Sequence, residues 1–321
     1  MKLLGLLVLA VPLLAAVDGT VVNRTSSKPQ PGVAVTLIRL GQGMQPAGSA
    51  TTDAQGRFRM DQEVQPGTPY LLQAEYEGVT YNRMLPPGSP STGLQVEVYE
   101  AKPEPGTAAV AQHMLLLEPS QDGLSVSESI IFENNGNATY YDPAKGTFRF
   151  YVPPQAGGQV RVSVQGPQGM PIERQPEQAG APGTYKVDYP VRPGETRFDL
   201  SYALPLSSPP VFESKLMHGG PLRIVAPRGV TLRGENVNSL GTEPRTQATI
   251  YDVKGPDYRV EIEGTGTLRG TAEPSGEQDT GPPIEQKKPP IYRSLYLILG
   301  LTLAMLAIGL LMLYRNPGTR T

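Results

Sequence analysis

Cysteine and tryptophan are absent from the 321 residues, and His113 and His218 are the only histidines. Without cysteine the chain has no disulfides, thiol nucleophiles, thiolate zinc sites or iron–sulfur clusters. Two histidines leave little for metal binding or acid–base chemistry. The chain also lacks a G-x-S-x-G nucleophile elbow, a phosphate-binding G-x-x-x-x-G-K-[ST] loop and a dinucleotide fingerprint. We therefore predict no enzyme activity, no catalytic residues, no metal and no cofactor.

Long helices are equally disfavoured, because 34 prolines and 36 glycines are distributed along the chain. Proline removes a backbone donor and breaks helix interiors. Short runs that alternate apolar and polar residues recur between turn residues instead. The clearest run is 198–204, where Phe198, Leu200, Tyr202 and Leu204 alternate with polar neighbours; similar runs cover 94–99 and 148–152. The sequence predicts an all-β fold of tandem β-sandwich domains.

The two ends of the chain carry its long apolar runs. Residues 1–16, MKLLGLLVLAVPLLAA, have the layout of a secretory signal peptide, with one early lysine, an apolar run and small residues at the end. We expect cleavage near Ala16, and an uncleaved anchor is the alternative. Residues 295–314 contain no charge, so we predict a transmembrane helix over 291–314 and a cytoplasmic tail over 315–321.

This arrangement predicts a single-pass protein of the cell membrane whose N-terminal region lies outside the cytoplasm. In a two-membrane bacterium that region would face the periplasm from the inner membrane, and in a one-membrane bacterium it would face the cell surface. When Lys2 and the five basic residues from Lys287 onward are set aside, 22 basic groups remain against 30 acidic ones, a net charge of −8. Such a surface repels nucleic acid, so we expect no nucleic-acid partner.

Composition also predicts the internal boundaries. Residues 17–99 form a first module, and the proline-containing polar stretch 100–107 is predicted to be a semi-rigid linker. A second β-sandwich region covers 108–266, either as one domain or as two with a break near 206–210. Residues 267–290 hold almost nothing to bury and are predicted to be a disordered proline-rich stalk.

Three segments of the first module occur in a distinctive order. These are Gly19 to Val21, the stretch PGVAV at 31–35, and TDAQGRF at 52–58, in which Asp53 to Gly56 is predicted to turn one strand into the next. The module thereby resembles the carboxypeptidase regulatory-like, or transthyretin-like, β-sandwich family. The resemblance implies a seven-stranded sandwich used as an accessory, adhesive or carbohydrate-associated module. It does not imply peptidase activity, since neither histidine begins an H-x-x-E pair.

Tyrosines are the remaining binding signal, with fifteen in the chain. Tyr76 and Tyr81 flank a predicted hairpin turn, and Tyr140 and Tyr141 lie beside another turn. Exposed tyrosines stack on sugar rings or anchor protein partners. These four are the predicted ligand or partner contacts, and half-buried strand tyrosines are the alternative interpretation.

The predicted function is that of a non-enzymatic, membrane-anchored cell-envelope protein that acts as an interaction or structural module. One alternative is a carbohydrate- or peptide-binding accessory module for a partner enzyme, and another is an accessory subunit of an inner-membrane complex. The partner would then be an envelope protein or a carbohydrate. The oligomeric state and the identity of the ligand stay open.

Overall fold

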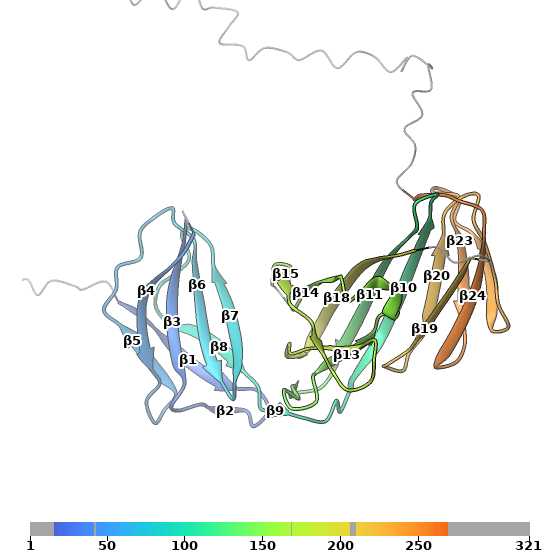
Figure 1. The fold of residues 1–321 in the computed structure, drawn as a ribbon. Helices are drawn as coiled ribbons and strands as arrows, with labels where there is room; N and C mark the ends of the chain where they lie inside the picture. Colours follow the sequence, from blue (N-terminus) through green and yellow to red (C-terminus); the bar gives the residue numbers. More distant parts are fainter. Residues whose placement is uncertain (1–15, 42, 168, 206–209, 269–321) are drawn as a thin grey trace, which may run out of the picture. The chain divides into compact units, whose positions relative to one another are not determined.

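The computed structural model describes residues 16–268, except for 42, 168 and 206–209, and its architecture is all-β (Figure 1). The only helix in this part of the chain is a short 3-10 helix, η1 (Pro154–Ala156). Within the described ranges no helix has the length and apolarity needed to cross a membrane. The predicted signal peptide up to residue 15, most of the stalk, the transmembrane helix at 291–314 and the tail lie outside the described residues.

Two four-stranded sheets make up the first module. One sheet consists of β1 (Val17–Asn23), β2 (Lys28–Pro29), β5 (Arg57–Met60) and β8 (Leu94–Val98). In it β1 pairs antiparallel with β2 and β5 and parallel with β8. The other sheet has the order β4 (Gly43–Thr51), β3 (Ala34–Gly41), β6 (Tyr70–Tyr76) and β7 (Val79–Leu85), and all its pairs are antiparallel.

One hydrophobic core joins these two sheets, because alternate residues of each strand point inward. Val17 and Val21 come from one sheet, and Leu37 and Leu72 come from the other; all four are fully buried. The predicted inward positions Leu94, Val96 and Val98 are buried as well, which confirms the alternation over 94–98. With the two-residue β2 included, the module has eight strands, one more than the resemblance implies.

The predicted turn at Asp53 to Gly56 is confirmed. The Asp53 carboxylate accepts the backbone N–H groups of Gln55 at 2.9 Å and Arg57 at 2.8 Å. Gly56 donates its N–H to the Asp53 carbonyl at 2.9 Å and has φ +70°. A residue with a side chain would be strained at that φ. The strand that follows the turn, β5, places Phe58 and Met60 in the core.

The segment predicted as a linker, 100–107, contains a short strand. β9 (Ala101–Lys102) pairs in parallel with β12 (Thr139–Tyr140), which belongs to the second region. The Thr139 N–H also donates to the Glu100 carbonyl at 2.9 Å. All described residues belong to one compact unit of the chain. The backbone of this segment is therefore hydrogen-bonded, and it does not run as a free spacer.

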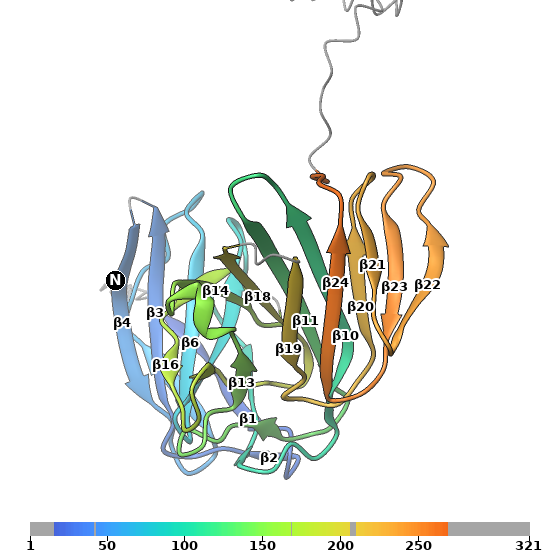
Figure 2. The same cartoon turned by 45° about the vertical axis from the view of Figure 1, so that its right-hand side comes forward.

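A single eight-stranded sheet organises the second region (Figure 2). Its order is β15 (Ile172–Arg174), β14 (Val160–Gln165), β18 (Gly194–Leu204), β11 (Leu124–Asn134), β10 (Ala108–Pro119), β20 (Leu222–Ala226), β23 (Thr249–Val253) and β22 (Val237–Thr242). The pair β10 and β20 is parallel, and the other pairs are antiparallel. Because β10 and β20 come from opposite sides of 206–210, this sheet connects both sides of the predicted break.

Two smaller sheets accompany the large one. The first has the order β13 (Phe148–Tyr151), β17 (Thr184–Val187) and β16 (Glu177–Gln178), and the second has the order β19 (Val211–Lys215), β24 (Asp257–Glu263) and β21 (Thr231–Arg233). Phe148, Phe198 and Phe212, one from each of the three sheets, belong to the same hydrophobic core. That core covers one face of the large sheet and leaves part of the other face open.

Candidate functional site

The open face of the eight-stranded sheet carries a floor of serines. Ser127 and Ser129 lie two residues apart on β11, so they share a face, and Ser127 is the register partner of Ser201 on β18. Ser163 on β14 is paired with Asp199 on β18, which in turn is paired with Ser129. Because serine side chains are short, the surface at these neighbouring positions lies close to the backbone of the sheet. The result is a hollow across three strands.

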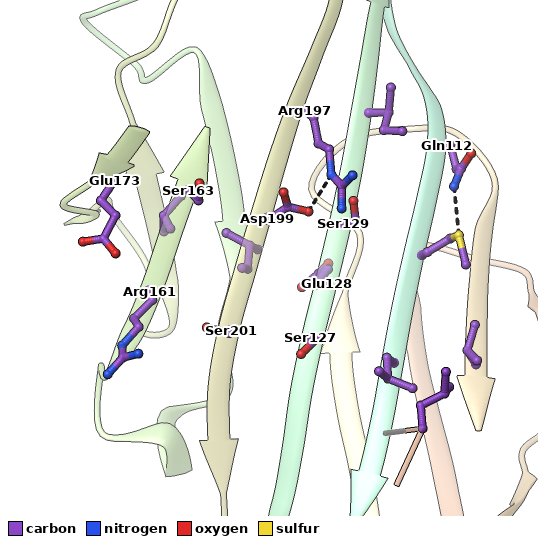
Figure 3. Close-up of a pocket in the computed structure, with 17 residues that line it drawn as sticks. Gln112, Ser127, Glu128, Ser129, Arg161, Ser163, Glu173, Arg197, Asp199 and Ser201 are labelled. Carbon is purple, nitrogen blue, oxygen red and sulfur yellow. Dashed lines mark hydrogen bonds and ion pairs between the residues drawn. The ribbon is translucent and has the colours of Figure 1, made fainter. Parts of the chain in front are cut away.

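Charged side chains also line the hollow: Arg161 and Glu173 lie on the side of β14 and β15, and Arg197 and Asp199 lie on β18 among the serines (Figure 3). Arg197 donates through Nε to the Asp199 carboxylate at 2.8 Å, on the same strand β18. Arg161 on β14 is the register partner of Ser201, and Glu173 on β15 is the partner of Ser163. All four side chains are at least partly exposed. These four side chains offer both hydrogen-bond donors and hydrogen-bond acceptors to a ligand.

Apolar side chains border the opposite side. Met114 and Leu116 alternate on β10, and Leu116 is paired with Val225 on β20. Leu268 lies beside them, because the Glu118 carboxylate accepts the N–H of Leu268 at 2.7 Å and the hydroxyl of Thr267 at 2.9 Å. Thr267 and Leu268 are therefore held against β10.

Together these residues enclose a groove of about 640 Å³, within the size range of ligand pockets. One side carries charged residues, the floor combines serine hydroxyls with the Arg197–Asp199 pair, and the other side is apolar. Among the described residues that line the groove there is no histidine or lysine.

Neither histidine lines the groove, although His113 is bonded to Glu128, which does. His113, on β10, is buried, and its Nε2 lies 2.5 Å from Oε1 of the buried Glu128 on β11. His218 stacks on the ring of Phe148 and meets Phe132 edge-on, and its Nε2 accepts the N–H of Arg149 at 3.2 Å. Burial lowers the pKa of His218 to about 4, so it is neutral at pH 7. Both rings are held by packing and hydrogen bonds.

The structure places the four predicted tyrosines around strands β9 and β12. Tyr81 on β7 is buried, and its hydroxyl donates to the Tyr99 carbonyl at 2.7 Å and accepts from the Thr139 hydroxyl at 2.9 Å. Burial raises the pKa of Tyr81 to about 12, so this hydroxyl remains a donor at neutral pH. Tyr76, half-buried, accepts an N–H of Asn23 at 3.4 Å.

Tyr140 and Tyr141 contribute to different cores although they are adjacent. Tyr140 is partly buried against the core of the second region, and Tyr141 is partly buried against the core of the first module. The N–H of Tyr141 donates to the Lys102 carbonyl at 2.8 Å. None of the four lines the serine-floored groove, and Tyr81 lines a second cavity, a cleft beside β7 and β8. Their role as ligand contacts stays a prediction.

Metal binding receives no support from side-chain clustering. Within the ranges that the structure describes, no group of three or more histidine, aspartate or glutamate side chains is arranged to hold an ion. Glu261 and Glu263 share one face of β24, as their spacing indicates, and both are exposed. They form part of a solvated strand face.

Sequence reasoning did not identify the groove, and none of its candidate contact residues lies there. The alternation in β18 places Arg197, Asp199 and Ser201 on the face opposite the core. The sequence therefore did contain one indication of the groove, namely the polar residues that alternation places on the outer face of several strands. The order of those strands in the sheet, β14, β18, β11 and β10, does not follow the chain, and it decides which polar residues become neighbours.

No protein-family model matches the chain, and no match was found among the curated proteins. Among solved structures, the chain is similar to an M1 zinc metallopeptidase from Deinococcus radiodurans, with 14% identity over 48% of this chain and 42% of that chain and a TM-score of 0.27. It is also similar to a mutant M1 zinc metallopeptidase from Deinococcus radiodurans bound to a Tyr-Ser-Ala substrate, with 17% identity over 53% of this chain and 51% of that chain and a TM-score of 0.26. The matches thus span about half of those chains or less, and such low TM-scores indicate nothing about activity.

Proposed function

We propose that this protein is an exported, non-enzymatic, membrane-anchored component of the cell envelope that acts as an interaction or structural module. The groove on the open face of the eight-stranded sheet is the observation that carries the proposal. It combines serine hydroxyls, an Arg197–Asp199 pair and an apolar wall, which together can hold a partner segment with both polar and apolar groups. The first module, the stalk and the membrane helix present this groove outside the cytoplasm.

The first module is proposed to belong to the carboxypeptidase regulatory-like, or transthyretin-like, family. Three features of the described residues support this. The G-x-V segment lies on the central strand β1, the segment 52–58 forms the Asp53 turn, and two sheets enclose one core. In this proposal the module is an accessory domain that supports the second region and performs no chemistry.

The positions of the histidines support a binding role over catalysis. His113 is bonded to Glu128 in the interior, and His218 is enclosed by Phe132 and Phe148. Neither histidine lines the groove. A hydrolase of the serine–histidine type would need a histidine within hydrogen-bond reach of its nucleophile, and the described residues that line the groove with the serines include none.

The location is tested with protease added to sealed, right-side-out spheroplasts that contain the full chain. We expect the region 17–266 to be degraded while a cytoplasmic marker protein survives. Survival of that region in intact spheroplasts, followed by its degradation after lysis, would contradict export.

The groove is tested with a matched pair of variants of the full chain. Ser129→Arg inserts a long side chain into the groove floor, whereas Ser125→Arg places the same side chain on the same strand, exposed and outside the groove. We expect cross-linking of the protein in its own envelope to give an adduct that Ser129→Arg abolishes and Ser125→Arg retains. An adduct that both variants retain would show that the partner binds elsewhere. An adduct that is a polysaccharide would favour the carbohydrate-binding alternative over a protein partner.

A further inference from the structure

A second cavity of about 410 Å³ lies beside strands β7 and β8 (Figure 1 labels both strands). These strands are edge strands of the two sheets of the first module. Asn82 and Arg83 from β7 and Gln95 and Glu97 from β8 line it. Pro167, Arg192 and Pro193 from the second region complete it. The cleft therefore exists only when both parts of the compact unit are in place.

Arg192 enters this cleft from the second region with its guanidinium held in position. Its Nη1 donates to the Thr80 carbonyl at 3.1 Å, and its Nη2 donates to the Tyr189 hydroxyl at 3.3 Å. Its Nε is buried and has no acceptor among the described atoms. A guanidinium has five N–H donors, so this side chain has donors to spare.

Arg83 lines the same cleft from the first module. Its Nη1 donates to the Gln95 carbonyl at 2.5 Å, which brings the side chain from β7 across to β8. Within the described part of the chain, neither Arg83 nor Arg192 forms an ion pair, because their acceptors are carbonyl and hydroxyl oxygens. Both residues are partly buried, so solvent screens their charges less than it screens exposed ones.

The single carboxylate that lines the cleft is engaged elsewhere. Glu97 is ion-paired with Arg24, which is not among the lining residues, and it also accepts the Tyr99 hydroxyl at 3.4 Å. The charge of Glu97 is thus matched outside the cleft. Two arginine charges remain unmatched inside it, in a protein whose outward region is acidic overall.

We propose that this cleft binds a small ligand through an oxyanion, a carboxylate or a phosphate group, held between Arg83 and Arg192. The guanidinium fork matches both groups with paired hydrogen bonds. The side chains of Tyr81, Tyr99, Pro167 and Pro193 provide apolar walls for the body of the ligand, and Asn82 and Gln95 provide polar side chains beside them. The binding site is distinct from the serine-floored groove, so this proposal can be tested independently of the proposed function.

Isothermal titration calorimetry on the full chain, at low ionic strength, tests the site with three probes: glucuronate for the carboxylate, inorganic phosphate for the phosphate, and glucose as the uncharged control. We expect saturable binding of at least one anion, weakened by added salt, and no binding of glucose. Arg83→Gln and Arg192→Gln are expected to lower the affinity about tenfold or more, because each removes a charge-assisted contact. The probe that binds more tightly identifies the class of oxyanion.

Two further variants separate binding from folding. Arg57→Gln, on the exposed side of β5 and outside the cleft, is the matched arginine control and should bind as the unmodified protein does. Glu97→Gln removes the only lining carboxylate and should tighten anion binding severalfold, an effect that damage to the fold would not produce. Absence of saturable binding by both anions, or unchanged affinity in both Arg83→Gln and Arg192→Gln, would overturn the proposal.

Discussion

The hydroxyl of Tyr81 and the hydroxyl of Thr139 lie 2.9 Å apart and are hydrogen-bonded, although 58 residues separate them in the chain. Tyr81 belongs to strand β7 of the first module, and Thr139 belongs to strand β12 of the second region. Thr139 is fully buried, and Tyr81 is 4% exposed. A buried polar contact between the two parts of the unit thus accompanies the pairing of β9 and β12.

Tyr81→Phe is expected to lower the free energy of unfolding by about 1 to 3 kcal/mol, because it leaves the Thr139 hydroxyl and the Tyr99 carbonyl without this partner. Urea denaturation measures the loss. Thr139→Val and the double variant complete a double-mutant cycle, in which the two single losses should not add. Additive losses would mean that the two hydroxyls do not interact.

The His113–Glu128 pair is expected to respond unequally to replacement of its two members. Removing His113 with His113→Ala leaves the buried carboxyl group of Glu128 without its hydrogen-bond partner, which costs about 1 to 3 kcal/mol. Glu128→Gln retains a hydrogen-bonding side chain opposite the imidazole and should cost less. Chemical denaturation measures both. Arg59→Gln, at an exposed ion pair with Asp61, is the control and should change stability by about 0.5 kcal/mol or less. Equal losses for Arg59→Gln and His113→Ala would contradict the burial of the pair.

His218 predicts a loss of stability in mild acid. Burial lowers its pKa in the folded state to about 4 from 6.5, so the unfolded chain binds the proton more readily. The stabilisation is complete above pH 6.5 and is lost as the pH falls towards 4, to a total of about 3 kcal/mol.

The measurement is the free energy of unfolding against pH, compared between the unmodified protein and His218→Gln. The groups that act on the ring are Arg149, through its N–H and its charge, and His113, through its charge. We expect the slope between pH 6.5 and 4 to be shallower in the variant, which has no imidazole to titrate. Parallel curves for the two proteins would show that His218 is not the group responsible.

Gly19→Ala is expected to destabilise the first module by at least about 2 kcal/mol. A Cβ at this position of β1 would lie 2.2 Å from the carbonyl oxygen of Leu94 on β8, so the two paired strands would have to separate. Gly41→Ala is the matched control, since nothing lies within 4 Å of a Cβ there. Thermal unfolding of both variants measures the difference, and similar melting temperatures would refute the close approach of β1 and β8.

Local chemistry explains the parts of the fold that were predicted correctly. Phe198, Leu200 and Tyr202 alternate with polar residues, and alternation at a period of two specifies a half-buried strand wherever that strand lies. The turn at Asp53 is equally local, because its hydrogen bonds join residues at most four positions apart. Such features follow from neighbouring residues alone.

The pairing of distant strands has no comparable local signature. Whether Tyr81 is exposed or buried depends on its partner strand, and the structure buries it against Thr139 while it also lines the cleft beside β7 and β8. The serines of the groove become neighbours because β14, β18, β11 and β10 are adjacent in the sheet, an order that differs from their order in the chain.

The amino-acid sequence by itself determined the all-β class, the inward faces of the strands within 94–99, 148–152 and 198–204, and the Asp53 turn, because these depend on side-chain periodicity and backbone preferences within a few residues. Only the tertiary structure decided that Arg192 reaches the Thr80 carbonyl 112 residues away and shares a cleft with Arg83. Contacts of that kind depend on which strands pair and on how the sheets pack around their cores. The free energy that favours one pairing over another comes from interactions along the whole chain.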